Sequence, residues 1–209
     1  MEEKPQTVRL AYYGISPWEI EVIYGLFNEK FEVIQEAEHE KIEGFVSALT
    51  ITIPLPFSEE FFKWFGFKPW EKVKSIIKEM KRRRGNGKAI RVEILFQTEE
   101  WNKIHTVARS KQNGEGPILS DNDERLPDYP DVQFITDLSE NHSFNSAIEK
   151  IDFMVELLPY HLNHSKMKNW CKKPMIVRYD YDVHSGKWYV GHVLSFDGGR
   201  TFYIDDLRN

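Results

Sequence analysis

The sequence predicts an α+β protein, with a ferredoxin-like βαββαβ half followed by a helix and a C-terminal antiparallel β-meander. In the first half, apolar residues recur with the helical period of about 3.6 in some stretches and with the strand period of two in others. Signals for caps and turns, such as Ser16-Pro17 and the Gly-Asn-Gly sequence at 85–87, separate these stretches. The C-terminal stretch alternates apolar and polar residues between glycine-containing turns, which is typical of a meander.

The first half is expected to form a two-layer sandwich over residues 1–109. Its first helix has the best-defined start, because Ser16 and Glu19 form a capping box and Pro17 occupies the first helical position. An apolar stripe then continues to Asn28. The other expected elements are strands at 8–13, 31–38, 44–53 and 89–97, helices that start at Ser58 and at Pro69, and a further hairpin strand at 103–109.

Large aromatic side chains are densest between residues 57 and 70. They are Phe57, Phe61, Phe62, Trp64, Phe65, Phe67 and Trp70. They occur on both sides of a short helix, so one helix face cannot hold them all. We interpret them either as the centre of the core or, in part, as an exposed anchor for a partner, because aromatic residues are enriched at binding hot spots. The candidate binding residues in this stretch are Trp64, Phe65, Phe67 and Trp70.

A basic run, Lys81 to Arg84, closes the helix that follows the aromatic stretch. Cations are favourable at the C-terminal end of a helix, where the helix dipole is negative. The alternative is that the run binds a phosphate group or an acidic partner. Arg82, Arg83 and Arg84 are therefore also candidate binding residues.

A polar segment at residues 110–131, punctuated by glycine and proline, is expected to separate the two halves of the chain. The second half, residues 132–209, is expected to pack on the first and begins with a short strand. A helix follows, for which Ser146 and Glu149 predict a capping box. Pro159 is expected to end or kink this helix.

The meander can be predicted residue by residue from its turns. Ser185-Gly186 is expected to be a two-residue hairpin loop, which pairs His184 with Lys187. A second turn at residues 197–198 then sets Tyr189 opposite Asp206. The predicted core face consists of Val177, Tyr179, Tyr181, Val183, Trp188, Val190, His192 and Leu194.

The other face of the meander would carry Asp180, Asp182, His184 and Asp206. Side chains opposite one another on neighbouring strands lie about 5 Å apart, so these carboxylates could share a cation or perturb each other's pKa. They are the candidate catalytic residues of a hydrolase that uses acid–base or metal-assisted chemistry. The alternative is a solvated face whose charges prevent aggregation at a sheet edge.

Composition limits the function classes further. The chain has 209 residues, of which 41% are hydrophobic and 14% aromatic, enough to bury a sizeable core. The net charge of -5 argues against a general nucleic-acid binder. No apolar run approaches the roughly 20 residues that span a bilayer, and the charged N-terminus shows no secretory signal. A cytoplasmic location without membrane association is expected.

No metal or cofactor is predicted. His161, His164 and Cys171 are residue types that zinc accepts, but their spacing matches no standard zinc pattern. A phosphate-binding loop and a nucleophile elbow are also missing from the sequence.

The sequence therefore favours a cytoplasmic protein-interaction module with no evident catalytic motif. Its partner would be a protein whose identity the sequence does not reveal, and nucleic acid is an unfavoured partner. The first alternative is the hydrolase described above. A weaker alternative is a small-molecule or nucleic-acid sensing domain that uses the meander and the basic run together.

Overall fold

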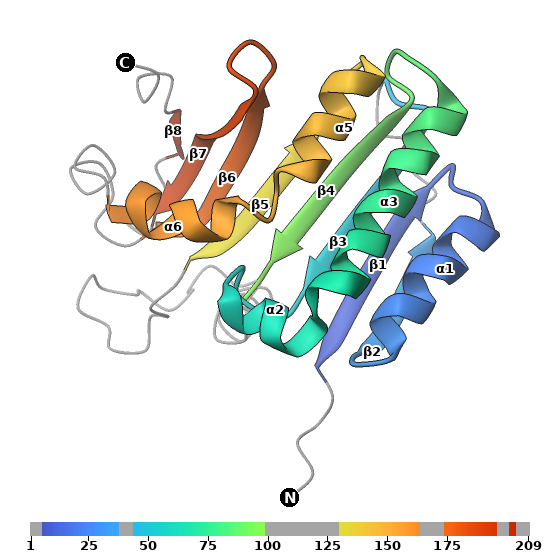
Figure 1. Cartoon of the computed structure of the whole chain (residues 1–209), viewed down its shortest axis with the longest axis horizontal. Helices are drawn as coiled ribbons and strands as arrows, with labels where there is room; N and C mark the ends of the chain where they lie inside the picture. Colours follow the sequence, from blue (N-terminus) through green and yellow to red (C-terminus); the bar gives the residue numbers. More distant parts are fainter. Residues whose placement is uncertain (1–5, 38–43, 99–129, 164–173, 196–200, 204–209) are drawn as a thin grey trace, which may run out of the picture.

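A computed structural model describes residues 6–37, 44–98, 130–163, 174–195 and 201–203 of the chain. The strands are β1 (Thr7–Tyr13), β2 (Glu32–Ala37), β3 (Ser47–Ile53), β4 (Ile90–Phe96), β5 (Asp131–Thr136), β6 (Pro174–Asp182), β7 (Lys187–Ser195) and β8 (Thr201–Tyr203). The helices are α1 (Pro17–Asn28), α2 (Glu59–Phe65), α3 (Phe67–Arg84), α5 (Asn141–Glu149) and α6 (Met154–Asn163). All these strands form one sheet in the order β2-β1-β3-β4-β5-β6-β7-β8, and the helices cover one face of it (Figure 1).

Three strand–helix–strand units make up most of the sheet. β1 and β2, β3 and β4, and β5 and β6 are parallel pairs, and antiparallel pairing of β1 with β3 and of β4 with β5 joins the units. The first two crossovers are right-handed, as nearly all such connections are (Figure 1). β5 runs in the same direction as β1, but its unit advances toward the opposite edge with its helices on the same face. The β5–β6 connection therefore has the opposite hand, which makes the sheet unusual.

The prediction of a fold that mixes helices and strands is confirmed, but the ferredoxin-like topology is not found. In that topology another strand separates the two strands of each βαβ unit. Here they are direct neighbours, so the sheet is mixed and not antiparallel. The element order βαββαβ is compatible with both arrangements, because it does not specify which strands pair.

The sheet also continues across the expected boundary between the halves, since β4 pairs with β5. The expected strand at 103–109 lies outside the described residues, as does most of the polar segment 110–131. Asp131, assigned to that segment, is instead the first residue of β5.

The core lies between the sheet and the helix layer. β4 shows the predicted alternation, with Ile90, Val92, Ile94 and Phe96 buried. Aromatic rings fill the centre: Phe27 of α1 stacks on Phe65 with ring centroids 4.6 Å apart, and Phe61 and Trp70 are fully buried. Burial of such large side chains is the main source of stability in this half of the protein.

Helix starts test the capping predictions. The capping box of α1 is confirmed, because Ser16 accepts from the backbone N–H of Glu19 and the Glu19 side chain accepts from the Ser16 backbone. The predicted cap at Ser58 forms no side-chain hydrogen bond to α2. The predicted box at Ser146 is wrong, because this residue lies inside α5 and its hydroxyl contacts the hydroxyl of Tyr181 at 2.8 Å.

Pro159 does not end the predicted helix. The apolar stripe is broken instead after Glu149, where α5 ends, and Pro159 lies inside α6. A proline inside a helix removes one backbone hydrogen bond and crowds the carbonyl four residues earlier, and α6 nevertheless continues to Asn163.

Candidate functional site

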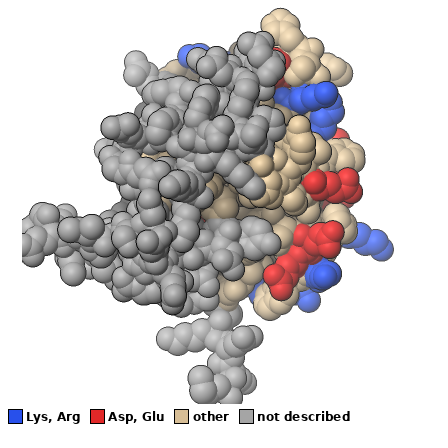
Figure 2. Space-filling model, turned by 90° about the vertical axis from the view of Figure 1, so that its left-hand side faces the viewer, with Lys and Arg blue, Asp and Glu red and all other residues tan. Residues whose placement is uncertain are grey.

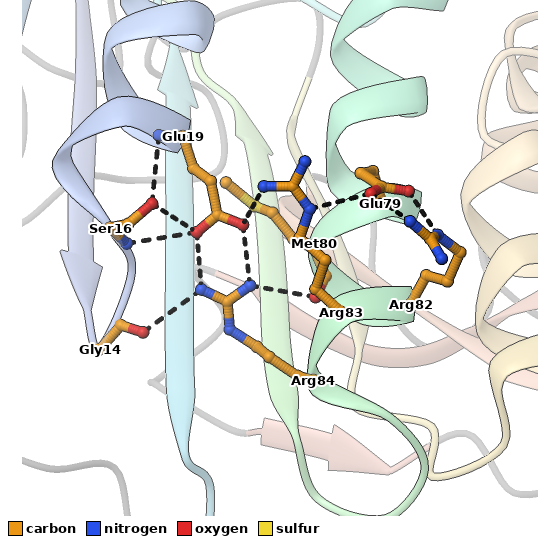
Figure 3. Close-up of polar contacts among 8 residues, drawn as sticks. All are labelled: Gly14, Ser16, Glu19, Glu79, Met80, Arg82, Arg83 and Arg84. Carbon is orange, nitrogen blue, oxygen red and sulfur yellow. Dashed lines mark hydrogen bonds and ion pairs between the residues drawn. The ribbon is translucent and has the colours of Figure 1, made fainter.

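The basic run at the end of α3 is bound within the protein. The guanidinium group of Arg84 donates to both carboxylate oxygens of Glu19, at 2.8 and 3.1 Å, and to the carbonyl of Gly14 (Figure 3). Hydrogen bonding from Arg84, with further bonds from Ser16, lowers the pKa of Glu19 to about 2 although burial opposes this shift. The pair joins the first turn of α1 to the last turn of α3, and each charge suits the dipole of its own helix.

Arg82 and Arg83 share a second carboxylate. Both donate to Glu79, at 2.6 and 2.8 Å, and together they lower its pKa to about 2 (Figure 3). Arg83 also lies over the ring of Trp18, 5.4 Å from its centroid. Each predicted binding arginine thus already has a carboxylate partner, which weakens the case for a phosphate site there. Their role in binding stays a prediction.

Two lysines on α3 are buried and connect this helix to the strand–helix–strand unit of β5 and β6. Lys81 donates to the carbonyls of Gly87 and Ser139, at 3.0 and 2.8 Å, and burial lowers its pKa. Lys74 forms ion pairs with Glu71 at 2.7 Å and Asp152 at 3.0 Å. We assign both lysines to packing of the helix layer.

The aromatic stretch divides between core and surface. Phe65 and Trp70 are buried, so the prediction that they contact a partner does not fit their positions. The side chains of Trp64 and Phe67 are 48% and 60% exposed. Trp64 contacts the ring of Phe31 at a centroid distance of 5.6 Å. We call Trp64 and Phe67 the aromatic surface.

Phe67 is held in a similar way. Its ring stacks on that of Phe62, with centroids 4.5 Å apart and planes 6° from parallel. Gly66, at the break between α2 and α3, adopts a φ of 89°, which a glycine tolerates and other residues rarely do. This break separates α2, which carries Trp64, from α3, which begins with Phe67.

The hairpin between β6 and β7 has a longer loop than predicted. Asp182 pairs with Lys187 and Asp180 with Tyr189, so residues 183–186 form the loop. The carboxylate of Asp182 accepts from the His184 backbone N–H at 3.1 Å and from the Ser185 hydroxyl at 2.9 Å, which closes the turn.

The longer loop changes the predicted faces at the hairpin tip. Val183 was expected in the core and is exposed. His184 lies in the loop, beyond the last strand pair, so it is not on the sheet face with Asp180. The predicted offset between β7 and β8 agrees with the observed pair His192–Tyr203, but Asp206 lies outside the described residues.

An irregularity at Gly191 changes the rest of β7. The register shifts there, so His192 pairs with Arg178 on the face opposite the described helices, and Val193 is buried in place of Leu194. The prediction that His192 and Leu194 face the core is therefore wrong. A glycine inside a strand often marks such a bulge, and this was the signal in the sequence that could have revealed the change.

The bulge brings together Arg178, Asp180 and His192, which we call the charged cluster. Nε of Arg178 donates to Oδ1 of Asp180 at 2.9 Å, and Nη2 forms an ion pair with the same oxygen at 2.8 Å. Nδ1 of His192 lies 3.8 Å from the other oxygen, Oδ2. Of the predicted catalytic residues, only Asp180 belongs to this cluster, and the catalytic role of the four stays a prediction.

A second buried carboxyl lies at the start of β5. Asp131 is 0% exposed, and its Oδ1 accepts from the backbone N–H of Thr98 at 3.0 Å. Oδ2 has no hydrogen-bond partner in the described structure. Burial raises the pKa of Asp131 to about 7, so the group can hold or release a proton near neutral pH.

Comparisons with known proteins do not extend this picture. No family model, curated protein or solved structure matches the chain.

Among the described helices, none is long and apolar enough to cross a membrane. The described residues include no group of three or more His, Cys, Asp or Glu placed to hold a metal ion. On the described part of the face in Figure 2, acidic and basic side chains lie near one another, so the described residues form no patch of only positive or only negative charge there.

Proposed function

We propose that the protein binds another protein through the aromatic surface formed by Trp64 and Phe67. The observation that carries this proposal is that both rings are about half exposed while each packs on a buried ring. Tryptophan is among the residues most enriched at the centres of protein interfaces. A large exposed ring of this kind offers a partner apolar area to bury.

Preorganisation supports the same function. An interface residue that is free in solution loses conformational entropy when it binds, at a cost of about 0.5–1.5 kcal/mol for a flexible side chain. The contacts of Trp64 with Phe31 and of Phe67 with Phe62 already restrict these rings. Binding would therefore order them little further. Lys63 directly precedes Trp64 and Lys68 directly follows Phe67; both are exposed and would form a polar rim.

Photo-crosslinking in cells that produce the protein tests the proposal. A benzoyl-phenylalanine is placed at position 64 or 67, and the crosslinked proteins are identified by mass spectrometry. Trp18 is the matched control position, because it is an exposed tryptophan near the opposite end of α1 from Phe31. We expect one protein to be captured from positions 64 and 67 and not from position 18.

The purified complex then gives the quantitative test. Trp64→Ala should weaken binding roughly 30-fold, as expected for a hot spot worth about 2 kcal/mol. Trp18→Ala should leave the dissociation constant unchanged. Equal capture from positions 64 and 18, or a dissociation constant that Trp64→Ala does not alter, would refute the proposal.

A further inference from the structure

The charged cluster lies on the face of the sheet that the described helices leave uncovered, at the junction of β6 and β7 (Figure 1). Arg178 and His192 are directly opposite each other on the two strands, and Asp180 lies between them in space. One carboxylate therefore approaches two basic side chains. The three side chains are 33%, 27% and 23% exposed, in the order Arg178, His192 and Asp180, so solvent reaches all of them.

Arg178 has donors that Asp180 does not use. Nε donates to Oδ1 of Asp180 and Nη2 lies 2.8 Å from the same oxygen, so the carboxylate occupies one edge of the guanidinium plane. Among the described residues, Nη1 has no hydrogen-bond partner. A guanidinium carries five N–H donors in a fixed plane, and its free edge can donate to the paired oxygens of a carboxylate or phosphate. The contact with Asp180 fixes the direction of that free edge.

The backbone is shaped to hold Asp180 in this position. A Cβ atom at Gly191 would lie 1.9 Å from Oδ2 of Asp180, which is an impossible contact. Glycine at this position thus leaves space for the carboxylate, and the bulge turns His192 toward the same face. Bulges are frequent next to functional sites, where they redirect a side chain.

We propose that Arg178 and His192 bind an oxyanion, which is a phosphate or carboxylate group of a ligand. Asp180 is the positioning residue: it orients the guanidinium group and lies beside the imidazole ring. The donor set fits an anion and not a metal ion, because it includes an arginine and the described residues include no group of three or more His, Cys, Asp or Glu placed to hold a metal ion. This site is separate from the aromatic surface and does not depend on the function proposed for it.

Nuclear magnetic resonance titration tests the site with simple anions. Inorganic phosphate or acetate is added at constant ionic strength, with sodium chloride as the compensating salt, and the side-chain Nε signal of Arg178 is followed. We expect a saturable shift at millimolar concentrations. Saturation by phosphate alone would assign a phosphoryl group to the ligand, and saturation by acetate alone would assign a carboxylate.

Variants show whether the shift is specific to Arg178. Anion binding to them is followed through the backbone amide signals of β6 and β7. Arg178→Gln should abolish saturation. Arg178→Lys, which keeps the charge but loses the planar fork, should weaken binding about tenfold. Arg9→Gln is the matched control. Arg9 is exposed and has no carboxylate partner among the described residues. It lies in the same row across the sheet as Arg178, because the paired positions run from Arg9 through Thr52, Leu95 and Gln133 to Arg178.

Two results would overturn the proposal. One is the lack of any saturable shift with either anion in the intact protein. The other is an equal affinity in the wild type and in Arg178→Lys, because an anion attracted only by net charge does not distinguish the two side chains. The lysine variant keeps a cation beside Asp180, so this comparison remains possible if Arg178→Gln does not fold.

Discussion

Replacing Asp131 by asparagine should remove a large pH dependence from the stability of the protein. The pKa of this buried carboxyl is raised from 3.8 to about 7, so the folded state favours the protonated form. The contribution of Asp131 to stability is complete below about pH 4 and falls as the pH rises to about 7, above which it is constant. A difference of about three pH units at 1.36 kcal/mol each amounts to roughly 4 kcal/mol lost over this interval.

Urea denaturation of the wild type and Asp131→Asn, measured between about pH 4 and pH 8, tests this prediction. The asparagine can still accept from Thr98 through its carbonyl oxygen, and any cost of burying its amide does not change with pH. As the pH rises, the free energy of unfolding of the variant should therefore increase relative to that of the wild type. Asp137→Asn, at an exposed position just after β5, is the matched control and should follow the wild type. A constant difference between the wild type and Asp131→Asn at all pH values would refute the reasoning.

Three further predictions concern the core and the α1–α3 contact, each measured by urea denaturation. Glu19→Gln should lower the free energy of unfolding by about 3 kcal/mol at neutral pH, because the pKa of Glu19 is lowered from 4.5 to about 2. This loss should shrink as the pH falls from 4.5 to about 2. A loss that is equally large near pH 2 would contradict this prediction. Arg84→Ala should lower the free energy of unfolding because it removes the arginine that donates to both oxygens of buried Glu19, whereas exposed Arg82→Ala should cause no measurable change. Equal effects of the two changes would argue against the assigned roles. Phe61→Ala should cost about 3–5 kcal/mol, because the ring is fully buried among aromatic neighbours; a loss below about 1 kcal/mol would show that the ring is not part of a rigid core.

The aromatic surface and the charged cluster show where sequence reasoning stops. Spacing along the chain showed that the aromatic residues between 57 and 70 could not share one helix face. It did not reveal that Phe65 packs against Phe27 of α1 while Trp64 remains half exposed. That division depends on a helix distant in the sequence. The arginine run is similar, since Glu19, the partner of Arg84, lies 65 residues away.

The charged cluster depends on a single residue of register. Alternation along β7 assigned His192 to the core, and the bulge at Gly191 moved it to the opposite face beside Asp180. Because the side-chain period of a strand is two, one extra residue reverses every later assignment. The glycine in the strand was a visible signal, but its effect depends on the partner strand.

By itself, the sequence determined the features that local interactions control: the capping box that starts α1, the alternating burial of β4 and the mixture of helices and strands. These follow from residues within a few positions of one another, which interact in the same way in many folds. Only the tertiary structure decided the strand order, the hand of the β5–β6 connection, the burial of Phe65 and Trp70, and the meeting of Arg178 with His192. The physical reason is that backbone pairing and side-chain packing join segments far apart in the chain, and many pairings satisfy the same local pattern.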